Sequence, residues 1–201
     1  MEMGSHPNII KISNLRKAKN LTDLYVIFEL MEADLHTVIR AEICRDEQIR
    51  FISWQILAAL KYIHSAEIVH RDMKPSNILI NRDCTIKLAD FGLARYMKGV
   101  EEFVDPVLTD YIATRWYRPP EILLGSPLYG FSVDLWGFGC ILAEMYISKP
   151  MFPGSSTLNQ LQRILELTGA PNVADLNEIH SPLALSVFDK LTNPANKKTI
   201  G

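Results

Sequence analysis

Cysteine is scarce in this sequence, which has Cys44, Cys84 and Cys140 among its 201 residues. Their odd number and the absence of C-x-x-C spacing argue against a disulfide framework or a metal–thiolate site, and fit reduced thiols. Neither sign of charge is in excess, because 21 basic side chains face 23 acidic ones and leave a formal net charge of −2. This balance argues against nucleic acid or an anionic membrane as the main partner.

Membrane-spanning sequence is also missing, since no uncharged apolar run reaches the length of about eighteen residues that a transmembrane helix needs. The first residues, Met1–Gly4, show no signal peptide. The ten glycines form no G-x-G-x-x-G motif, which removes one common phosphate-binding loop. With no internal repeat or low-complexity segment, the sequence predicts a soluble globular protein of the cytoplasm or nucleus.

One pair of motifs carries the chemistry. Residues His70–Asn77 read His-Arg-Asp-Met-Lys-Pro-Ser-Asn, and Asp90-Phe91-Gly92 follows. Transfer of a phosphoryl group from ATP needs a carboxylate that orients the accepting hydroxyl, and an Asn and a second Asp that hold magnesium. We assign Asp72 to the hydroxyl, Asn77 and Asp90 to the metal, and Lys74 to the phosphate oxygens. Either motif alone is a common turn sequence, whereas both in this order predict a phosphotransferase.

The spacing between the two motifs predicts a β-hairpin. Ile78–Ile80 and Thr85–Ala89 are typical strands, and Asn81–Asp83 is a typical turn. The hairpin would bring Asn77 and Asp90 together across its open end. Magnesium prefers oxygen ligands and keeps several waters, so one amide oxygen, one carboxylate and the substrate phosphates make a plausible shell.

Beyond these motifs, the chain resembles the eukaryotic protein kinases, and the mitogen-activated protein kinase family in particular. The similar stretches are His6–Ile10, Tyr25–Met31, Met31–His36, Thr109–Tyr111 and Ala113–Glu121. The resemblance implies an α+β, protein-kinase-like fold. Residues 1–30 would be a remnant of the small lobe, and residues 31–201 a large lobe that is incomplete at its C-terminus, so we expect the middle of a domain, cut at both ends.

The resemblance also implies ATP and Mg²⁺ as cofactors. In the hinge, the Glu29 carbonyl and the Met31 amide would meet adenine, and Asp34 would meet the ribose. Leu79 would form the floor of the nucleotide site, and Ser76 would be a further nucleotide-binding residue.

An activation mechanism follows from charge. Residues 90–121 are long enough for a mobile loop, and phosphates on Thr109 and Tyr111 would each add about −1.5 to −2 charges. By resemblance, the phosphothreonine would bind Arg71 and Arg95, and the phosphotyrosine Arg115 and Arg118. The alternative is a solvated loop in which Thr109 and Tyr111 have no role.

The substrate class is implied by the resemblance. Lys74 is typical of serine/threonine kinases, and Trp116–Arg118 is similar to the segment of kinases that prefer proline directly after the phosphorylated residue. The implied partners are protein substrates with Ser-Pro or Thr-Pro, an upstream dual-specificity kinase and phosphatases.

The apolar patterns predict where helices and strands lie. Strands are expected at 9–16 and 24–30, and helices at 47–65 with Asp46 as N-cap, at 132–147 with Ser132 as cap, and from Ser155 or Ser156 to a stop at Gly169. The second helix is apolar nearly all round, so Asp134 within it needs a partner. By resemblance to kinases, that partner is the backbone of the catalytic loop.

Two functions remain open. The chain is either a piece of an active mitogen-activated kinase, or a truncated, pseudokinase-like module that acts as a decoy or scaffold through its large-lobe surface. The kinase family has a glycine-rich loop, a strand lysine and a helix glutamate that orient ATP, and none of the three has a counterpart here. Because phosphate positioning is nearly the whole of the catalysis, we expect the isolated 201 residues to be inactive.

Overall fold

The computed structural model describes residues 6–20, 22–97, 112–128 and 130–192. It combines helices with small antiparallel sheets, so the expected α+β class is confirmed. The helices are α1 (Leu35–Arg40), α2 (Asp46–Ser65), α3 (Pro120–Leu123), α4 (Ser132–Ile147), α5 (Thr157–Thr168), α6 (Val173–Glu178) and α7 (Ala184–Thr192). The strands are β1 (Ile12–Lys17), β2 (Leu24–Phe28), β3 (Ala33–Asp34), β4 (Ile68–Val69), β5 (Ile78–Ile80), β6 (Ile86–Leu88) and β7 (Arg95–Tyr96). Short 3₁₀ helices are η2 (Pro75–Asn77), η3 (Phe91–Leu93) and η4 (Ile112–Tyr117).

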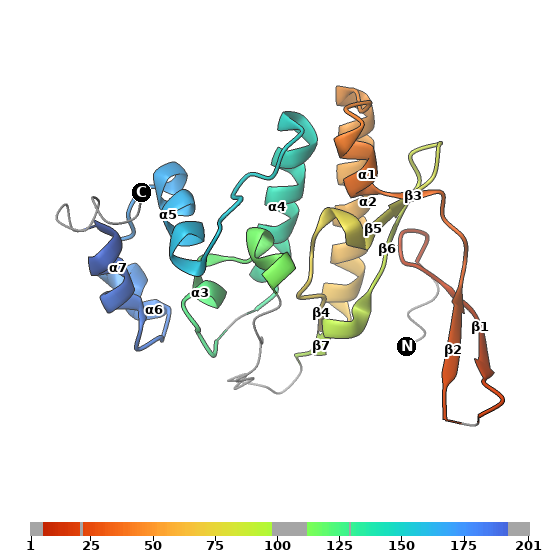
Figure 1. Ribbon diagram of the computed structural model, residues 1–201, viewed down its shortest axis with the longest axis horizontal. Helices are drawn as coiled ribbons and strands as arrows, with labels where there is room; N and C mark the ends of the chain where they lie inside the picture. The colour runs from red at the N-terminus through yellow and green to blue at the C-terminus, as the bar shows by residue number, and fades with distance from the viewer. Residues whose placement is uncertain (1–5, 21, 98–111, 129, 193–201) are drawn as a thin grey trace.

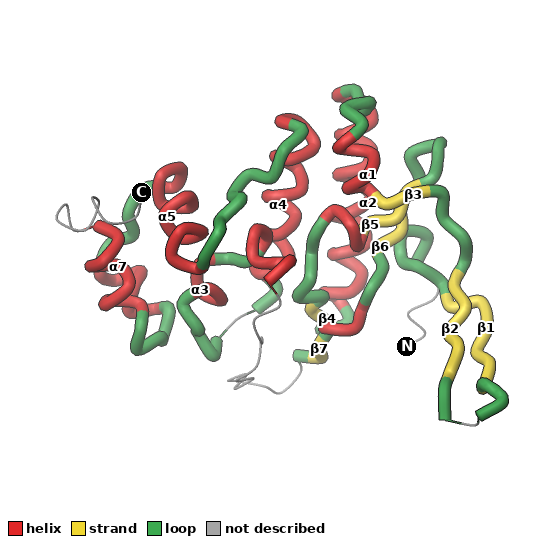
Figure 2. Tube along the Cα trace, in the orientation of Figure 1, coloured by secondary structure: helices red, strands yellow, loops and turns green. Residues whose placement is uncertain are grey.

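Strands β1 and β2 form a hairpin that projects from one end of the molecule (Figures 1 and 2). All residues of both strands are exposed. Both strands are shorter than expected, because β1 begins only at Ile12 and β2 ends at Phe28. The preceding Ile9 and Ile10 are buried instead, and Ile10 N donates a 2.9 Å hydrogen bond to the carbonyl of Leu88 in β6.

A second sheet has the order β3-β5-β6 and contains the predicted hairpin. Ile78 pairs with Leu88 and Ile80 with Ile86, and these four side chains are buried. The buried Gln55 of α2 supports this sheet, since its Oε1 accepts hydrogen bonds from Ile86 N at 3.0 Å and from Asn8 Nδ2 at 2.8 Å. The hairpin is thereby held against α2.

Helices α2 and α4 form the centre of the molecule and pack against each other (Figure 1). The apolar stripe of α2 is buried, as its spacing predicts, with Ile52, Ile56 and Ile63 fully inaccessible. The predicted N-cap was wrong: Arg45 is the N-cap, and Asp46 is the first helical residue. Arg45 takes this place because its backbone N–H donates to the Gln48 side chain at 2.9 Å.

Helix α4 begins at Ser132 and ends at Ile147, as predicted, but Ser132 does not cap it. The N-cap is Phe131, which makes no side-chain cap bond. Two acidic residues of this mainly apolar helix, Asp134 and Glu144, are fully buried. Each therefore needs a polar partner from another element.

Helices α5, α6 and α7 lie at the end of the molecule opposite the β1–β2 hairpin (Figure 1). The structure decides between the two expected starts of α5, because Ser156 Oγ accepts a 3.1 Å hydrogen bond from Asn159 N. Gly169 ends the helix with φ of +80°, as predicted. Within the described ranges, no helix has both the length and the apolar character needed to cross a bilayer.

Candidate functional site

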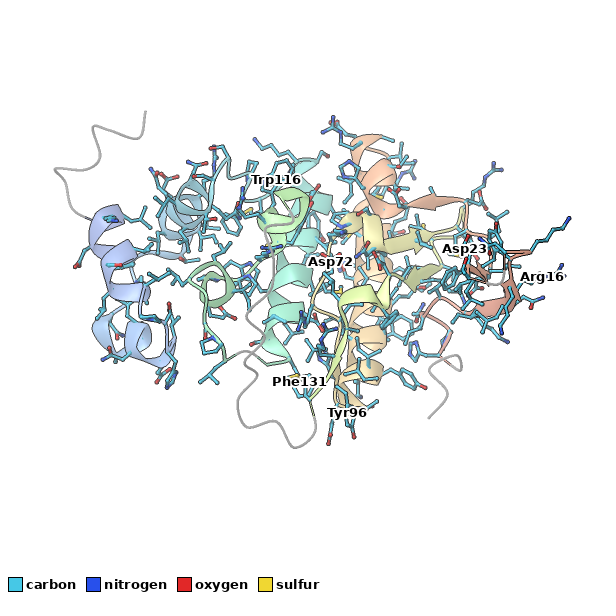
Figure 3. All side chains as sticks on the ribbon, turned by 60° about the horizontal axis from the view of Figure 1, so that its bottom comes forward. Arg16, Asp23, Asp72, Tyr96, Trp116 and Phe131 are labelled. Atoms are coloured by element: carbon cyan, nitrogen blue, oxygen red, sulfur yellow. The ribbon has the colours of Figure 1, made fainter. Side chains whose placement is uncertain are left out.

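The loop between β4 and η2 holds the predicted catalytic residues together. Lys74 Nζ lies 2.6 Å from Asp72 Oδ2, and Asn77 Nδ2 donates to the same oxygen at 3.0 Å. Asn77 Nδ2 also donates to the Asp72 carbonyl at 2.8 Å. Asp72 is only 6% exposed and lies near the middle of the molecule (Figure 3). Its carboxylate is thus fixed by two donors from its own loop.

Asp134 of α4 holds the backbone of this loop in place through hydrogen bonds. Its Oδ2 accepts from His70 N and its Oδ1 from Arg71 N, both at 2.8 Å. His64, at the end of α2, places Nε2 2.8 Å from the same Oδ2. The prediction that Asp134 binds the backbone of the catalytic loop is therefore confirmed. Arg71 adopts φ of +70°, a costly conformation that these bonds help to hold.

His70 connects the loop to the segment that carries Asp90. It is fully buried, its Nε2 lies 2.9 Å from the Ala89 carbonyl, and its ring meets Phe91 edge-on with centroids 4.9 Å apart. Burial lowers the pKa of His70, so the neutral ring is favoured. The opposing influences on that pKa are the bond to Ala89 and the carboxylates of Asp134, Asp72 and Asp90. His70 therefore links the loop that carries Asp72 to the segment that carries Asp90.

Asn77 and Asp90, the residues predicted to bind magnesium, flank the two strands of the β5–β6 hairpin. Ala89 N donates to the Asn77 carbonyl at 2.9 Å, which ties the residue before Asp90 to Asn77. Asp90 is exposed in the left-handed region with φ of +59°, and its Oδ1 accepts from Gly92 N at 3.3 Å. A Cβ at Gly92 would lie 3.2 Å from that Oδ1, so glycine leaves the carboxylate room.

This donor set fits magnesium. The Asn77 bonds described above use its Nδ2, which turns the amide oxygen away from Asp72, and the exposed Asp90 carboxylate supplies a second hard oxygen. The described residues contain no group of three or more His, Cys, Asp or Glu side chains that would form an all-protein cage. Two protein oxygens completed by water and phosphate are typical of magnesium at nucleotide sites.

Over residues 1–199 the sequence matches the protein kinase domain. The chain belongs to the protein kinase family. Extracellular signal-regulated kinase 2 of Dictyostelium discoideum is 51% identical over 201 residues, which are 99% of this chain and 54% of that protein. Mitogen-activated protein kinase 15 of Xenopus laevis is 50% identical, covering 96% of this chain and 33% of that protein. The protein of the same name from Caenorhabditis elegans is 48% identical, with 98% and 43% covered.

These relatives confirm that the kinase chain belongs to the mitogen-activated protein kinase family. The chain spans about half or less of their length. The kinase fold expected from the sequence is likewise confirmed.

The predicted nucleotide residues of the kinase lie along the segment from β2 to α1 and on η2 and β5. The Glu29 side chain lies 3.1 Å from Lys87 Nζ and accepts from Lys11 N at 2.9 Å. Asp34 Oδ1 accepts from Thr37 N at 2.7 Å and so caps α1. The ribose contact of Asp34 stays a prediction, and this cap bond leaves Oδ2 for it.

The three other residues predicted to bind the nucleotide differ in their exposure to solvent. Met31 is half-buried after β2, and Ser76 is exposed on η2. Leu79 is half-buried on β5, where it pairs with Asp34 of β3 and Lys87 of β6. This register sets Leu79 beside Asp34, so two of the predicted nucleotide residues share one sheet.

The predicted phosphorylation sites, Thr109 and Tyr111, lie outside the described residues. Of the arginines expected to bind their phosphates, Arg71 and Arg95 lie close to one small sheet, because Val69 of β4 pairs with Arg95 of β7. Arg115 and Arg118 sit on and just after η4, and Arg118 N donates to the Arg115 carbonyl at 3.1 Å. The four arginines thus come as two pairs from two parts of the kinase.

Four residues with polar contacts in or near this site were not predicted from the sequence. His64, Lys87, Glu144 and Gln160 each make a polar contact that no local motif announces. A signal existed for Glu144, because a carboxylate within an apolar helix needs a partner just as Asp134 does. His64 and Lys87 gave none, since a histidine at a helix end and a lysine on a strand are ordinary surface residues.

Proposed function

We propose that this protein is a serine/threonine kinase of the mitogen-activated type, which transfers the γ-phosphoryl group of ATP to a serine or threonine followed by proline. One observation carries the proposal. Asp72 is buried and fixed by Lys74 and Asn77 in a loop that Asp134 holds from beneath. An isolated carboxylate so oriented suits the positioning of a hydroxyl group in phosphoryl transfer.

In this proposal Asp72 orients the substrate hydroxyl and accepts its proton. Lys74 and Asn77 both contact Oδ2, so we assign the hydroxyl to Oδ1. Lys74 is half-buried, and its ammonium group would balance charge on the transferred phosphoryl oxygens. Lys74 and Asn77 hold the Asp72 carboxylate in one orientation before the substrate arrives.

Mg²⁺ bound to the ATP phosphates would neutralise their charge. We assign its protein ligands to the Asn77 amide oxygen and the Asp90 carboxylate. For the nucleotide we propose the Glu29 carbonyl and the Met31 amide as adenine contacts. The ribose and floor contacts are Asp34 and Leu79, with Ser76 nearby on η2.

Activation is proposed to follow phosphorylation of Thr109 and Tyr111 by an upstream dual-specificity kinase, with reversal by phosphatases. The pairing of β4 with β7 keeps Arg71 and Arg95 near each other, which supports a shared phosphate ligand. New charge-assisted hydrogen bonds from such arginines are a general means of ordering a loop. Replacing Thr109 by alanine should therefore abolish the gain in rate that the upstream kinase produces.

The test of the catalytic assignment is Asp72→Asn in the protein at its natural length. With ATP, magnesium and a Ser-Pro peptide, the rate of phosphate transfer should fall by about 10² to 10⁴, the usual contribution of a positioned base. Asp83→Asn, in the exposed turn of the β5–β6 hairpin, is the control and should leave the rate unchanged. A retained rate in Asp72→Asn would contradict the proposed mechanism.

A second candidate function is a binding module without catalysis. The 201 residues contain no G-x-G-x-x-G motif, and the apolar side chains of the β1–β2 hairpin are exposed. Thermal melting of the protein at its natural length with ATP and magnesium separates the two candidates. A binding module should show no shift in Tm, whereas a chain competent for the nucleotide should melt at a higher temperature.

A further inference from the structure

The end of η4 is joined to α4 by one side-chain hydrogen bond. Tyr117 Oη donates to Glu144 Oε2 at 2.7 Å, and Glu144 is fully buried. Its other oxygen, Oε1, is buried without a hydrogen-bond partner in the part of the chain that the structure describes. Burial raises the pKa of Glu144. Burying a carboxyl group costs free energy, and the hydrogen bond from Tyr117 offsets part of that cost for Glu144.

A second fastening lies one residue earlier. The Trp116 indole donates from Nε1 to the Gly154 carbonyl at 3.0 Å, and Gln160 Nε2 lies 3.4 Å from the Trp116 carbonyl. Gly154 N in turn donates to Gln160 Oε1 at 3.0 Å. Gln160 is fully buried on α5, and Trp116 lies at one edge of the molecule in Figure 3. Three residues from separate segments thus form a closed ring of hydrogen bonds.

Gly154 is the part of this ring that tolerates least change. A Cβ at this position would lie 2.4 Å from Gln160 Oε1 and 2.6 Å from Gln160 Cα. A Cβ essentially never comes this close to an atom to which it is not bonded, and one of the two contacts is to backbone, so a side chain at Gly154 must displace α5 or the loop. Either movement separates Gln160 from Trp116.

We propose that Glu144 and Gln160 are positioning residues that fix the segment 115–120, and through it the binding of the peptide substrate. Glu144 acts through Tyr117 and Gln160 acts through Trp116. Glu144 and Gln160 are themselves fully buried and cannot reach a peptide. The inference rests on the proposed kinase function and deepens it. The proposed nucleotide contacts lie between β2 and β3, on β3, on η2 and on β5, so loss of this anchorage should weaken peptide binding and spare ATP binding.

Two measurements on Glu144→Ala and Gln160→Ala test the proposal. The first is hydrogen–deuterium exchange of the segment 115–120, which should become about tenfold faster, the equivalent of one lost hydrogen bond. The second is the affinity for a fluorescent Ser-Pro peptide, measured by anisotropy with a non-hydrolysable ATP analogue. The peptide Kd should rise by a similar factor, and the Kd of the analogue should change by less than about twofold.

Matched variants separate positioning from general damage. Gly154→Ala should reproduce the effect of Gln160→Ala, whereas Gly139→Ala on α4, whose Cβ would meet no atom within 4 Å, should behave like the parent. Glu144→Gln keeps an acceptor for Tyr117 Oη and should restore most of the peptide affinity. If Glu144→Ala fails to fold, Tyr117→Phe removes only the hydroxyl group and gives the same readouts.

The outcomes distinguish this proposal from the kinase function itself. Faster exchange with an unchanged peptide Kd, or unchanged exchange in both alanine variants, would overturn the positioning role. An equal loss of peptide and nucleotide affinity would overturn it too, because that result indicates general loosening. If the parent protein binds no peptide while exchange responds as expected, the proposed function fails and the anchorage stands.

Discussion

Asp134 is the residue on which the order of the catalytic loop depends. It is fully buried on α4, and its two oxygens accept from His70 N and Arg71 N while contacting His64. The hydrogen bonds to these donors offset the free-energy cost of removing the Asp134 carboxylate from water. Its loss would leave two buried N–H groups without an acceptor.

The variant Asp134→Ala should therefore lower the free energy of unfolding by about 3 to 5 kcal/mol, as expected when one partner of a buried charged network is removed. Urea denaturation monitored by far-UV circular dichroism measures the change. Asp189→Ala on the exposed face of α7 is the control and should stay within about 0.5 kcal/mol of the parent. A small effect in Asp134→Ala would mean that the loop is held by other contacts.

His70 gives the protein a dependence on pH. Its pKa is lowered by burial in the folded state, while in the unfolded chain it takes up a proton near pH 6.5. As the pH drops below that value, the unfolded state binds more protons than the folded state. The free energy of unfolding therefore decreases as the pH drops, until the folded-state pKa is reached. The Tm should drop between pH 7.5 and pH 5.5, and the drop should be smaller in His70→Gln, which does not titrate. An equal drop in both proteins would assign the effect to other groups.

At the scale of an element, α5 shows how local sequence sets both ends of a helix. Ser156 caps the first turn, and Gly169 ends the last with a positive φ that glycine adopts without strain. Between them, Leu161 and Ile164 are buried against α3, α4 and α7. The helix is thus bounded locally and held in place by distant contacts.

Ser156→Ala should reduce the free energy of unfolding by about 1 kcal/mol, because the N–H of Asn159 loses its acceptor. Ser155→Ala is the matched control, since its hydroxyl makes only an exposed 3.4 Å contact with Asn159 Oδ1. The measurement is the midpoint of urea denaturation of each variant, and we expect the m-value to be the same in both. Equal losses in the two variants would mean that Ser156 is not the effective cap.

At the scale of the whole molecule, the two ends differ in how well they are covered. The helical body buries its apolar side chains in three clusters. The β1–β2 hairpin leaves exposed apolar side chains, including Tyr25 at 61% and Phe28 at 49%. A two-stranded sheet with free edges is marginal alone and prone to pair with other strands.

The 201-residue chain should consequently self-associate as its concentration rises, which sedimentation velocity measures. Replacing Val26 and Phe28, which lie on one face of β2, by threonine should shift the population to monomer, since threonine keeps the strand propensity and removes apolar area. Leu183→Thr with Leu185→Thr, at exposed sites in and just before α7, is the control and should have no such effect. A monomeric parent at all concentrations would contradict this prediction.

Much of the fold could be read from local patterns. The three- and four-residue spacing of Ile49, Ile52 and Ile56 predicts α2, because the helix period acts over a few residues. Two strand-like runs around the turn at 81–83 predict the β5–β6 hairpin, because turn signals are local as well. The predicted ends were less accurate where a distant contact competed. Ile9 joins Leu88 rather than extending β1, and Asp46 yields the cap position to Arg45.

The candidate site divides in the same way. The amino-acid order alone predicts which chemistry the site carries, because Asp72, Asn77 and Asp90 stand at fixed offsets within short segments. Folding established the supporting contacts, since His64 reaches Asp134 across 70 residues and Tyr117 reaches Glu144 across 27. No local rule foresees such pairs. They exist because helix packing buries polar groups, and a buried polar group is stable only beside a partner.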